Sequence, residues 1–306
     1  MSMFQPATFL VTGSTDGIGL LTVHLLAKLP TRSDDNVTVI GIHGRCPKRI
    51  QSAVWEVNRL IPEENRMCFQ IKTFCYDLSD VKQVQLFVDD VIKKFTFDNV
   101  FKLDVLINNA ALFDDKGPRR SPDGRFELTF SVNVIAVFII TYKLLHHAHK
   151  CNKFIYKVIN TASISHKDCS HHLKKLDYEN LQFENGLDWT SFSSYGLSKL
   201  LVIMATRGFF YHNEWRNKIG LHTCLINMDP GTVNTKMLLA GWGACGMPVN
   251  EATDTFQLAT DSKFYQPNSE PKYYVHLRER NPTALCSDKA ACVELFQYLE
   301  NICRLK

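Results

Sequence analysis

Apolar residues gather along the chain in short runs rich in β-branched side chains, and the stretches between the runs show apolar residues at helical spacing. Such runs are typical of buried strands, and strands that alternate with helices form parallel sheets covered on both faces. We therefore predict an α/β fold with a single doubly wound parallel sheet. The predicted strands are Thr8–Thr12, Asn36–Ile42, Phe69–Tyr76, Val105–Asn108, Phe154–Asn160, His222–Met228 and Lys272–Val275.

Two long segments interrupt this alternation. Residues 164–192 are polar and punctuated by Asp and Asn, and residues 236–270 combine glycines, prolines and apolar side chains. Because α/β folds place substrate loops beyond the carboxyl ends of their strands, we expect an insert at the rim of the site and a mobile lid, respectively. We expect all 306 residues to form one domain.

Composition narrows the class of protein. Apolar residues make up 45% and charged residues 22%, as in ordinary globular proteins. The formal net charge of +4 is small and the basic residues are interspersed with acids, so we predict no nucleic-acid partner. The cysteines show no CxxC pairing, no signal peptide is evident, and no apolar run reaches membrane-spanning length. We expect a cytoplasmic protein with reduced thiols and no integral membrane segment.

A glycine-rich turn follows the first predicted strand and leads directly into a predicted helix, Leu20 to Leu29. Glycines let the backbone approach a pyrophosphate closely, and free N–H groups at the helix start bind its charge. Alone, the pattern also fits a tight turn without a ligand. The residues that we expect to bind phosphate are Gly13, Ser14, Thr15, Asp16, Gly17, Ile18 and Gly19.

The end of the second predicted strand indicates which nucleotide binds. No Asp or Glu stands there to hold a ribose diol, whereas Arg45 offers a planar cation for a 2′-phosphate and Lys48 and Arg49 could assist. We therefore predict NADP(H). Two observations weigh against it: Arg45 could simply solvate a helix start, and Asp16 adds a negative charge nearby.

Two other strand ends carry residues suited to a nucleotide. Asp77, followed by Leu78, closes the third predicted strand, where its carboxylate could accept a hydrogen bond from adenine or cap a helix that begins near Ser79. Asn109 and Ala110 close the fourth, where small residues and amides suit a backbone lying against a nucleotide, although a plain turn has the same composition.

Tyr195 and Lys199 lie four residues apart at the start of a predicted helix, so the phenol and the ammonium share one helix face. A nearby cation favours phenolate, and a Tyr with its ordinary pKa of about 10 needs such help to exchange protons near neutral pH. We predict that Tyr195 transfers the proton and that Lys199 lowers its pKa.

Ser163 and Asn133 extend this catalytic set. Ser163 stands just beyond the fifth predicted strand, where its hydroxyl could hold a carbonyl oxygen. Asn133 is polar within an apolar helical stripe, and a buried amide that held a water between Lys199 and solvent would serve as a proton relay. Each pattern alone occurs by chance on many helices, so it is their order along the chain that favours catalysis.

In this order the motifs resemble the short-chain dehydrogenase/reductase family. The matching segments are TGxxxGIG at Thr12 to Gly19, an NNAG-like motif at Asn108 to Ala111, then Asn133, Ser163, YxxxK at Tyr195 to Lys199, and Pro230-Gly231-Thr232-Val233. The long gap between Ser163 and Tyr195, and Lys272-Tyr273-Tyr274 ahead of a last helix, resemble the retinol dehydrogenase and WW-domain oxidoreductase branch.

The resemblance implies a Rossmann-fold enzyme that transfers a hydride between NADP(H) and a carbonyl or alcohol substrate. It also implies that Lys199 binds the nicotinamide ribose and that Thr232 and Val233 lie by the nicotinamide. Pro230, Gly231 and Val233 are expected among the residues that bind the cofactor. The chain departs from the family pattern in three ways. Ala111 replaces a glycine, and Asp229 precedes Pro230 in place of the common His. We also expect no N-terminal anchoring helix of the kind that many retinol dehydrogenases have.

Several alternatives stay open. The apolar residues of 236–270 favour a lipophilic substrate such as a retinoid, steroid or fatty aldehyde, although core packing explains them equally well. These residues are Met237, Leu238, Leu239, Trp242, Phe256 and Phe264. Instead of an enzyme, the chain could be an NADP(H)-binding sensor or scaffold without turnover.

The histidines and the apolar stripes of two helices raise the questions of metal binding and self-association. His146, His147 and His149, or His171 and His172, lack a Cys/His pattern that would complete a zinc site, so we predict no metal. Two helices, around Asn133 to His149 and Tyr195 to Tyr211, carry apolar stripes that could pair with a second copy into a homodimer.

Overall fold

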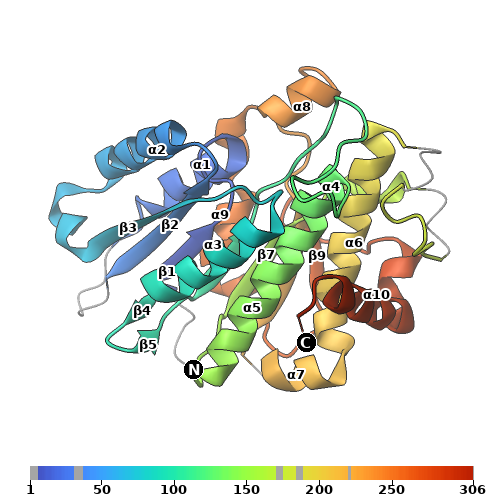
Figure 1. The fold of residues 1–306 in the computed structure, drawn as a ribbon. Coiled ribbons are helices and arrows are strands. Elements are labelled where there is room, and N and C mark those ends of the chain that lie inside the picture. The colour runs from blue at the N-terminus through green and yellow to red at the C-terminus, as the bar shows by residue number, and fades with distance from the viewer. Residues whose placement is uncertain (1–5, 31–36, 170–174, 184–188, 220–221, 306) are drawn as a thin grey trace.

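The computed structural model describes residues 6–30, 37–169, 175–183, 189–219 and 222–305 (Figure 1). Its main sheet has eight strands in the order β10-β9-β8-β7-β6-β1-β2-β3, and neighbours pair in parallel except β9 and β10. The bounds are β1 Thr8–Val11, β2 Thr38–Gly44, β3 Phe69–Cys75, β6 Val105–Asn108, β7 Lys157–Thr161, β8 Cys224–Asp229, β9 Lys272–Val275 and β10 Arg278–Glu279.

Helices cover both faces of this sheet (Figure 1). One face carries α1 (Gly17–Leu26), α2 (Pro47–Leu60) and α9 (Asp254–Thr260); the other carries α3 (Val81–Lys94), α5 (Val137–Lys150), α6 (Ser191–Tyr211) and α10 (Lys289–Ile302). Three shorter helices are α4 (Leu128–Phe130), α7 (Asn213–Ile219) and α8 (Lys236–Gly241). The predicted doubly wound α/β fold is thus confirmed.

All seven predicted strands are present, with ends shifted by at most three residues. They were readable because both faces are buried: Phe9, Leu10 and Val11 of β1 are all fully covered. The hairpin of β4 (Thr96–Phe97) and β5 (Val100–Phe101) was not predicted. Its two-residue strands are too short to show a period, and its turn rests on positive φ angles at Asp98 and Asn99.

Three asparagines stand side by side across the centre of the sheet, and we call Asn108, Asn160 and Asn227 the asparagine ladder. All are buried. Asn108 donates to Asn160 Oδ1 (2.8 Å), Asn160 donates to the Thr206 hydroxyl (2.9 Å), and that hydroxyl also contacts Asn227 Oδ1 (2.9 Å). Asn108 also donates to Thr141 of α5 (3.0 Å). The ladder therefore joins the sheet to α5 and α6.

Residues 254–264 of the predicted lid pack against the sheet instead of covering a site. Leu258 of α9 is fully buried, Phe264 is 6% exposed, and Phe256 packs against the same core. The buried Lys157 of β7 donates from Nζ to the carbonyl oxygens of Leu258 and Asp261, both at 2.8 Å, and so caps the end of α9. The prediction that all of 236–270 forms a lid is wrong, because composition does not separate core from surface; α8 has no buried residue.

Candidate active site

The glycine-rich turn between β1 and α1 is folded tightly against the end of β6. Gly13 has φ +64°, and a Cβ added there would lie 2.8 Å from Ala110 Cα. A Cβ on Gly19 would overlap the carbonyl oxygen of Gly13. Only glycine allows this close approach, which is also what a backbone needs in order to contact a pyrophosphate.

Asn109 and Thr12 hold the turn in this shape. The Thr12 hydroxyl accepts the backbone N–H groups of Asn109 and Ala110, each at 3.0 Å. The side-chain amide of Asn109 donates to the carbonyl oxygens of Thr12 (3.0 Å) and Gly13 (3.2 Å). The predicted site residues Asn109 and Ala110 are therefore part of the frame that shapes the glycine turn.

Ser14 and His43 join the turn to β2. The Ser14 hydroxyl donates to Val11 O and accepts the His43 N–H, both at 2.9 Å, and it is fully buried. Any contact of Ser14 with a nucleotide is therefore left to its backbone. Burial lowers the pKa of His43 to about 4, and the neutral ring accepts the Gly13 N–H at Nδ1 (3.1 Å). His43 was missed from the sequence, although a polar residue inside an apolar strand was its signal.

Asp16 caps α1 and carries a charge that two cations balance. Its carboxylate accepts the Gly17 N–H (2.9 Å), pairs with Lys236 of α8 (2.5 Å) and lies 3.8 Å from Arg49 of α2. Thr15 and Ile18 stay partly exposed beside it. The negative charge that weighed against NADP(H) is thus offset by its neighbours.

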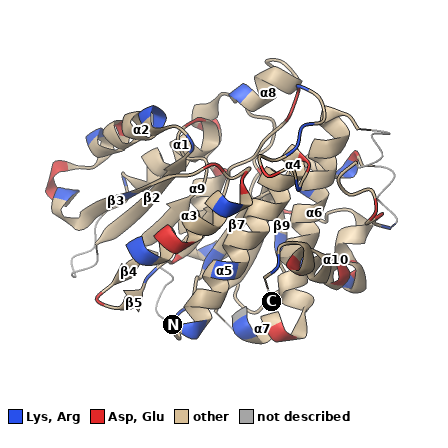
Figure 2. Ribbon diagram, in the orientation of Figure 1, with Lys and Arg blue, Asp and Glu red and all other residues tan. Residues whose placement is uncertain are grey.

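Arg45 is exposed directly after β2, at the start of α2. Lys48 and Arg49 lie in the first turn of that helix, and Figure 2 shows basic residues along α2. Gly44 ends β2, and no Asp or Glu stands between it and Arg45. That Arg45 binds a 2′-phosphate stays a prediction.

Asp77 does not cap a helix. The N-cap of α3 is Asp80 and the helix begins at Val81, later than predicted, while Asp77 Oδ1 accepts the Ser79 N–H (2.9 Å) in a turn. Asp77 stays partly exposed at the strand end and Leu78 is buried beneath it. The alternative reading of Asp77 as an N-cap is therefore wrong.

The ends of β7 and α6 bring Ser163, Tyr195 and Lys199 together. Lys199 donates from Nζ to Thr161 O at 2.7 Å, and Nζ lies 5.4 Å from the centroid of the Tyr195 ring. The Tyr195 phenol is hydrogen-bonded to the Ser163 side chain. Tyr195 is 9% exposed and Lys199 2%. The sequence placed these three side chains in one group, and the structure brings them into contact.

Burial, more than the neighbouring ammonium, sets the proton affinities of this group. Burial and then the Asp229 carboxylate raise the pKa of Tyr195, and the Ser163 hydrogen bond acts in the opposite direction. Burial lowers the pKa of Lys199 to about 8, and Asp229 opposes that shift. The predicted lowering of the Tyr195 pKa by Lys199 is not found in this structure, where the ammonium is directed to Thr161 O.

Asn133 lies in a π-helical turn, Ser131–Ala136, ahead of α5. Its amide accepts the Leu112 N–H (2.7 Å) and donates to Leu112 O (2.9 Å) and to the Ser198 hydroxyl (3.0 Å). A π-turn is a local irregularity often found at functional sites. These bonds clamp the loop after β6 onto α6, and a relay from Asn133 to Lys199 stays a prediction.

The segment after β8 turns sharply beside the same group. Gly231 has φ +75°, and a Cβ on it would overlap the His276 ring. Its N–H is accepted by Asp229 Oδ1 at 2.8 Å. Pro230 is partly exposed and Val233 is buried. The predicted residues Pro230, Gly231 and Val233 thus lie at the carboxyl edge of the sheet, where open α/β folds bind ligands.

Comparison with known proteins agrees with this geometry. A family model described as short chain dehydrogenase matches residues 7–173, which is more than half of the chain. The chain belongs to the short-chain dehydrogenase family. Human polyprenol dehydrogenase is 27% identical over 229 residues, which cover 74% of this chain and 60% of that relative. Mouse retinol dehydrogenase 13 is 24% identical over 304 residues, covering 94% of this chain and 81% of the relative.

Solved structures share the fold of this short-chain dehydrogenase chain. An uncharacterised protein from Mycobacterium paratuberculosis superposes with a TM-score of 0.67 at 18% identity, covering 98% of this chain and 96% of the other. A short-chain dehydrogenase from Sphingobium yanoikuyae in complex with NADPH gives a TM-score of 0.54 at 16% identity, covering 81% and 82%. At these identities the likeness concerns the fold.

Aromatic rings cover Tyr195 in this family member. Phe113 lies 5.8 Å from the Tyr195 ring, 5.3 Å from Phe192 and 4.6 Å from Trp242, measured between centroids. Trp242 follows α8, and Gly241 lets it approach, since a Cβ there would lie 2.9 Å from the Phe113 ring. Phe192 and Trp242 are 48% and 39% exposed, so the rings form an apolar mouth at the group. Phe113 was not picked out from the sequence.

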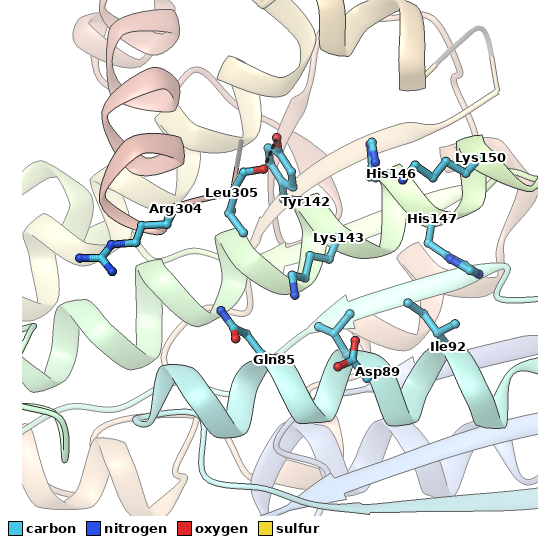
Figure 3. Close-up of a pocket in the computed structure, with 11 residues that line it drawn as sticks. Gln85, Asp89, Ile92, Tyr142, Lys143, His146, His147, Lys150, Arg304 and Leu305 are labelled. Carbon is cyan, nitrogen blue, oxygen red and sulfur yellow. Dashed lines mark hydrogen bonds between the residues drawn. The ribbon is translucent and has the colours of Figure 1, made fainter.

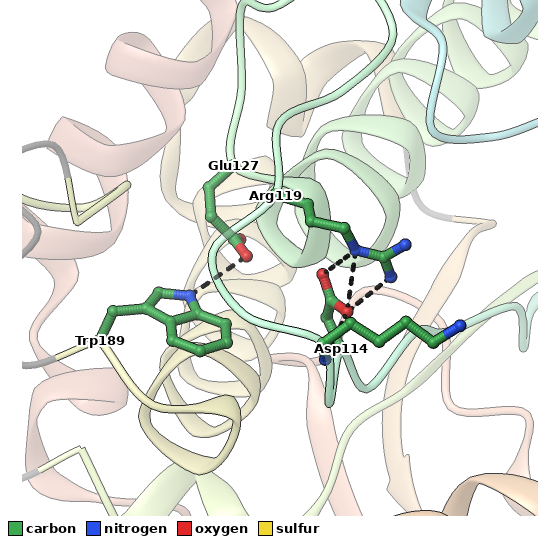
Figure 4. Close-up of polar contacts among 5 residues, drawn as sticks. Asp114, Arg119, Glu127 and Trp189 are labelled. Carbon is green, nitrogen blue, oxygen red and sulfur yellow. Dashed lines mark hydrogen bonds and ion pairs between the residues drawn. The ribbon is translucent and has the colours of Figure 1, made fainter.

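An ion pair shapes the loop that carries Phe113 (Figure 4). The Asp114 side chain is fully buried, and Arg119 donates to both of its oxygens, from Nε at 2.9 Å and from Nη2 at 2.5 Å. Trp189, near the end of the predicted rim insert, donates to Glu127 at 3.5 Å. Parts of that insert, 170–174 and 184–188, lie outside the described residues.

A cavity of about 320 Å³ lies between α3, α5 and the C-terminal residues (Figure 3). Lys143, His147 and Arg304 are among its walls, and none of the predicted site residues lines it. Within the ranges that the structure describes, no group of three or more His, Cys, Asp and Glu is arranged to hold a metal ion. His171 and His172 lie outside those ranges.

The apolar stripe of α6 is covered within the chain by α10. Residues 194–209 of α6 are all buried, and a Cβ on Gly208 would lie 2.7 Å from Cys292 O of α10. Tyr142 of α5 donates to Glu300 of α10 at 2.8 Å. The homodimer contact predicted through α6 therefore has no free face. In the described part of the chain, one helical stretch, Leu128–Lys150, has the length and hydropathy of a membrane span, and 78% of its apolar 18-residue window is buried inside the protein.

Proposed function

We propose that the protein is an NADP(H)-dependent oxidoreductase that interconverts a carbonyl compound and an alcohol. The observation that carries this proposal is the contact among Ser163, Tyr195 and Lys199 at the carboxyl edge of the sheet, the edge that also carries the glycine turn. Family membership supports it. A bound nicotinamide nucleotide would supply or accept the hydride, and the protein would orient it and handle the proton.

The residues around the turn fit a dinucleotide. The backbone from Gly13 to Gly19 offers the cradle for the pyrophosphate, because side chains are excluded from its tightest points. Arg45 is free to meet a 2′-phosphate, which favours NADP(H) over NAD(H). Asp77 would face the adenine, and Pro230, Gly231 and Val233 would face the nicotinamide.

The chain's own residues would manage one proton. In reduction, Ser163 donates a hydrogen bond to the substrate oxygen, and the Tyr195 hydroxyl gives its proton to that oxygen as the hydride arrives at carbon. We propose that the Lys199 ammonium, which in this structure is bonded to Thr161 O, stabilises the phenolate once the proton has left. In oxidation the phenolate takes the proton back. The buried positions of Tyr195 and Lys199 strengthen these interactions by excluding water.

We propose a lipophilic substrate. The mouth formed by Phe113, Phe192 and Trp242 offers aromatic surface and no charged side chain among these three residues. The names of two relatives, polyprenol dehydrogenase and retinol dehydrogenase 13, support a long apolar alcohol or its carbonyl. We also propose that the protein works in the cytoplasm, where its ten free thiols stay reduced.

A nucleotide titration with turnover measurements tests the proposal. We expect tighter binding of NADPH than of NADH, and NADPH consumption with apolar aldehydes or ketones. Arg45→Asp should weaken NADPH binding by roughly tenfold or more and leave NADH nearly unchanged, since a charge-assisted bond contributes about 1.5–3 kcal/mol. Arg59→Asp, at the far end of the same helix, is the matched control.

Tyr195→Phe should keep nucleotide binding and lose turnover. Preference of the unsubstituted protein for NADH would contradict the assignment of Arg45. Nucleotide binding without turnover on any aldehyde, ketone or alcohol of the panel would contradict the enzymatic function and favour a sensor or scaffold.

A further inference from the structure

Asp229 is a buried carboxylate at the centre of the proposed site. It is the last residue of β8 and is 3% exposed. Oδ1 accepts the Gly231 N–H at 2.8 Å, and Oδ2 accepts the Tyr273 hydroxyl at 3.4 Å. A buried carboxylate costs free energy unless it is paired. Holding the turn at Gly231 is therefore a weak reason for a carboxylate at this position.

The sheet brings Asp229 next to the catalytic group. Met228 of β8 pairs with Thr161 of β7, and Ala162 N donates to Met228 O at 2.7 Å. Asp229 therefore lies beside the segment that leads to Ser163, and Lys199 is bonded to Thr161 O in that same segment.

Of the described polar groups around Asp229, His166 and Tyr273 are uncharged, and Asp254 is a second carboxylate. His166, in the short helical turn Ile164–Lys167 after β7, accepts the Thr283 N–H at Nε2 (3.3 Å), so its Nδ1 donates to Ser163 O (2.6 Å) and the ring is neutral. Burial lowers the pKa of His166, in agreement. Tyr273 of β9 is an uncharged phenol. The Asp254 carboxylate of α9 lies 3.7 Å from His276.

We propose that Asp229 is a positioning residue whose negative charge keeps both the Tyr195 phenol and the Lys199 ammonium protonated. The site is thereby set to give a proton to a carbonyl and resists taking one from an alcohol, so reduction persists to higher pH than it otherwise would. The inference rests on the proposed function of the same site.

The electrostatics point the same way for both partners. A negative charge disfavours a second negative charge on the phenol and favours the positive charge on the ammonium. In agreement, Asp229 raises the pKa of Tyr195 and acts against the burial that lowers the pKa of Lys199 to about 8. Removing the charge should therefore make both groups lose their protons at lower pH.

Asp229→Asn separates charge from shape. The amide oxygen still accepts the Gly231 N–H, and apart from the charge only the long hydrogen bond from the Tyr273 hydroxyl (3.4 Å) is lost, because an amide nitrogen cannot accept it. We expect the alkaline limb of the pH profile, where the rate of carbonyl reduction falls, to move to lower pH by roughly one pH unit. Asp104→Asn is the matched control, because Asp104 also accepts backbone N–H bonds, from Ala7 (2.8 Å) and Thr8 (2.9 Å), but lies at the opposite edge of the sheet. Its profile should match that of the unsubstituted protein.

A second measurement needs no turnover. The titration of Lys199 can be followed by NMR of isotopically methylated lysines, with the signal assigned by its absence in Lys199→Met. Its midpoint should fall by roughly one unit in Asp229→Asn and stay unchanged in Asp104→Asn. Asp229→Glu keeps the negative charge, so the Lys199 midpoint and the alkaline limb should both stay near their original values. This variant keeps the proposal testable if Asp229→Asn does not fold.

The outcomes of the two measurements are distinct. An unchanged Lys199 midpoint in folded Asp229→Asn overturns the role of Asp229 whether or not the enzyme turns over. A shifted midpoint in a protein that reduces no carbonyl supports the electrostatic coupling and counts against the proposed function alone. A shifted midpoint with an unmoved alkaline limb overturns the claim that the coupling governs reduction.

Discussion

The Thr206 hydroxyl is the point at which the asparagine ladder meets α6, and removing it tests how strongly the ladder holds that helix. Thr206→Val keeps the shape of the side chain and removes the oxygen that lies 2.9 Å from both Asn160 Nδ2 and Asn227 Oδ1. Each buried polar group left without its partner costs about 1–3 kcal/mol. Two such groups give an expected loss of about 3 kcal/mol in the free energy of unfolding.

Urea denaturation followed by tryptophan fluorescence measures this loss, provided that the slope with denaturant is unchanged. Thr22→Val is a matched control, since Thr22 is equally buried and its hydroxyl also donates to the carbonyl four residues earlier, Ile18 O at 2.8 Å. Thr206 makes a similar bond to Val202 O at 2.7 Å, and its one hydrogen is shared between that oxygen and Asn227 Oδ1. We expect Thr22→Val to lose no more than about 1 kcal/mol.

Equal losses in the two variants would refute the reasoning, because the substitutions differ chiefly in the two amides. A loss for Thr206→Val of less than about 1 kcal/mol would show that water or local rearrangement satisfies the amides.

Three further predictions concern the pair of Asp114, the cap of α9 and the glycine turn. Arg119→Ala should lower the free energy of unfolding by about 2–3 kcal/mol, because Asp114 stays buried without its cation, and adding Asp114→Asn should restore most of the loss in urea denaturation. Burial lowers the pKa of Lys157 from 10.5 to about 8. Between these two pH values the unfolded chain therefore binds more protons than the folded chain, so the free energy of unfolding rises with pH. The unfolding free energy of the unsubstituted protein relative to Lys157→Met should therefore increase by roughly 2 kcal/mol from pH 8 to pH 10, and a constant difference would contradict the assigned pKa. Gly19→Ala should weaken NADPH binding by roughly tenfold or more in a fluorescence titration, because its Cβ would displace Gly13 O; unchanged binding would show that the turn can relax.

The fold and the catalytic group were predictable because their signals are local. Buried parallel strands such as β1 are continuous apolar runs, and Tyr195 and Lys199 share a helix face by spacing alone. Spacing does not reveal what each side chain contacts across the fold, however. The Lys199 ammonium is directed to Thr161 O, and the charge that acts most on Tyr195 comes from Asp229, which the sequence showed only as a departure from the family pattern.

Apolar composition was similarly ambiguous beyond β8. Phe264 and Trp242 belong to the same predicted lid, yet one is buried in the core and the other stands at the mouth of the site. Which face of the sheet a residue reaches depends on contacts between distant segments. For the same reason the sequence did not predict that Phe113 lies at the site. The helix that covers α6 could not be assigned for that reason either, although α10 itself has helical spacing.

The asparagine ladder also has a consequence for how the sheet assembles. Parallel strands rich in Val and Ile can slide past one another with little change in apolar contact, so such strands specify their alignment weakly. A shift of β7 by one residue would turn Asn160 toward the face beneath α1 and α9 and would bring Ile159 opposite its neighbours on the other side. Misaligned sheets would then bury amides without partners, and this penalty selects a single alignment of the three central strands during folding.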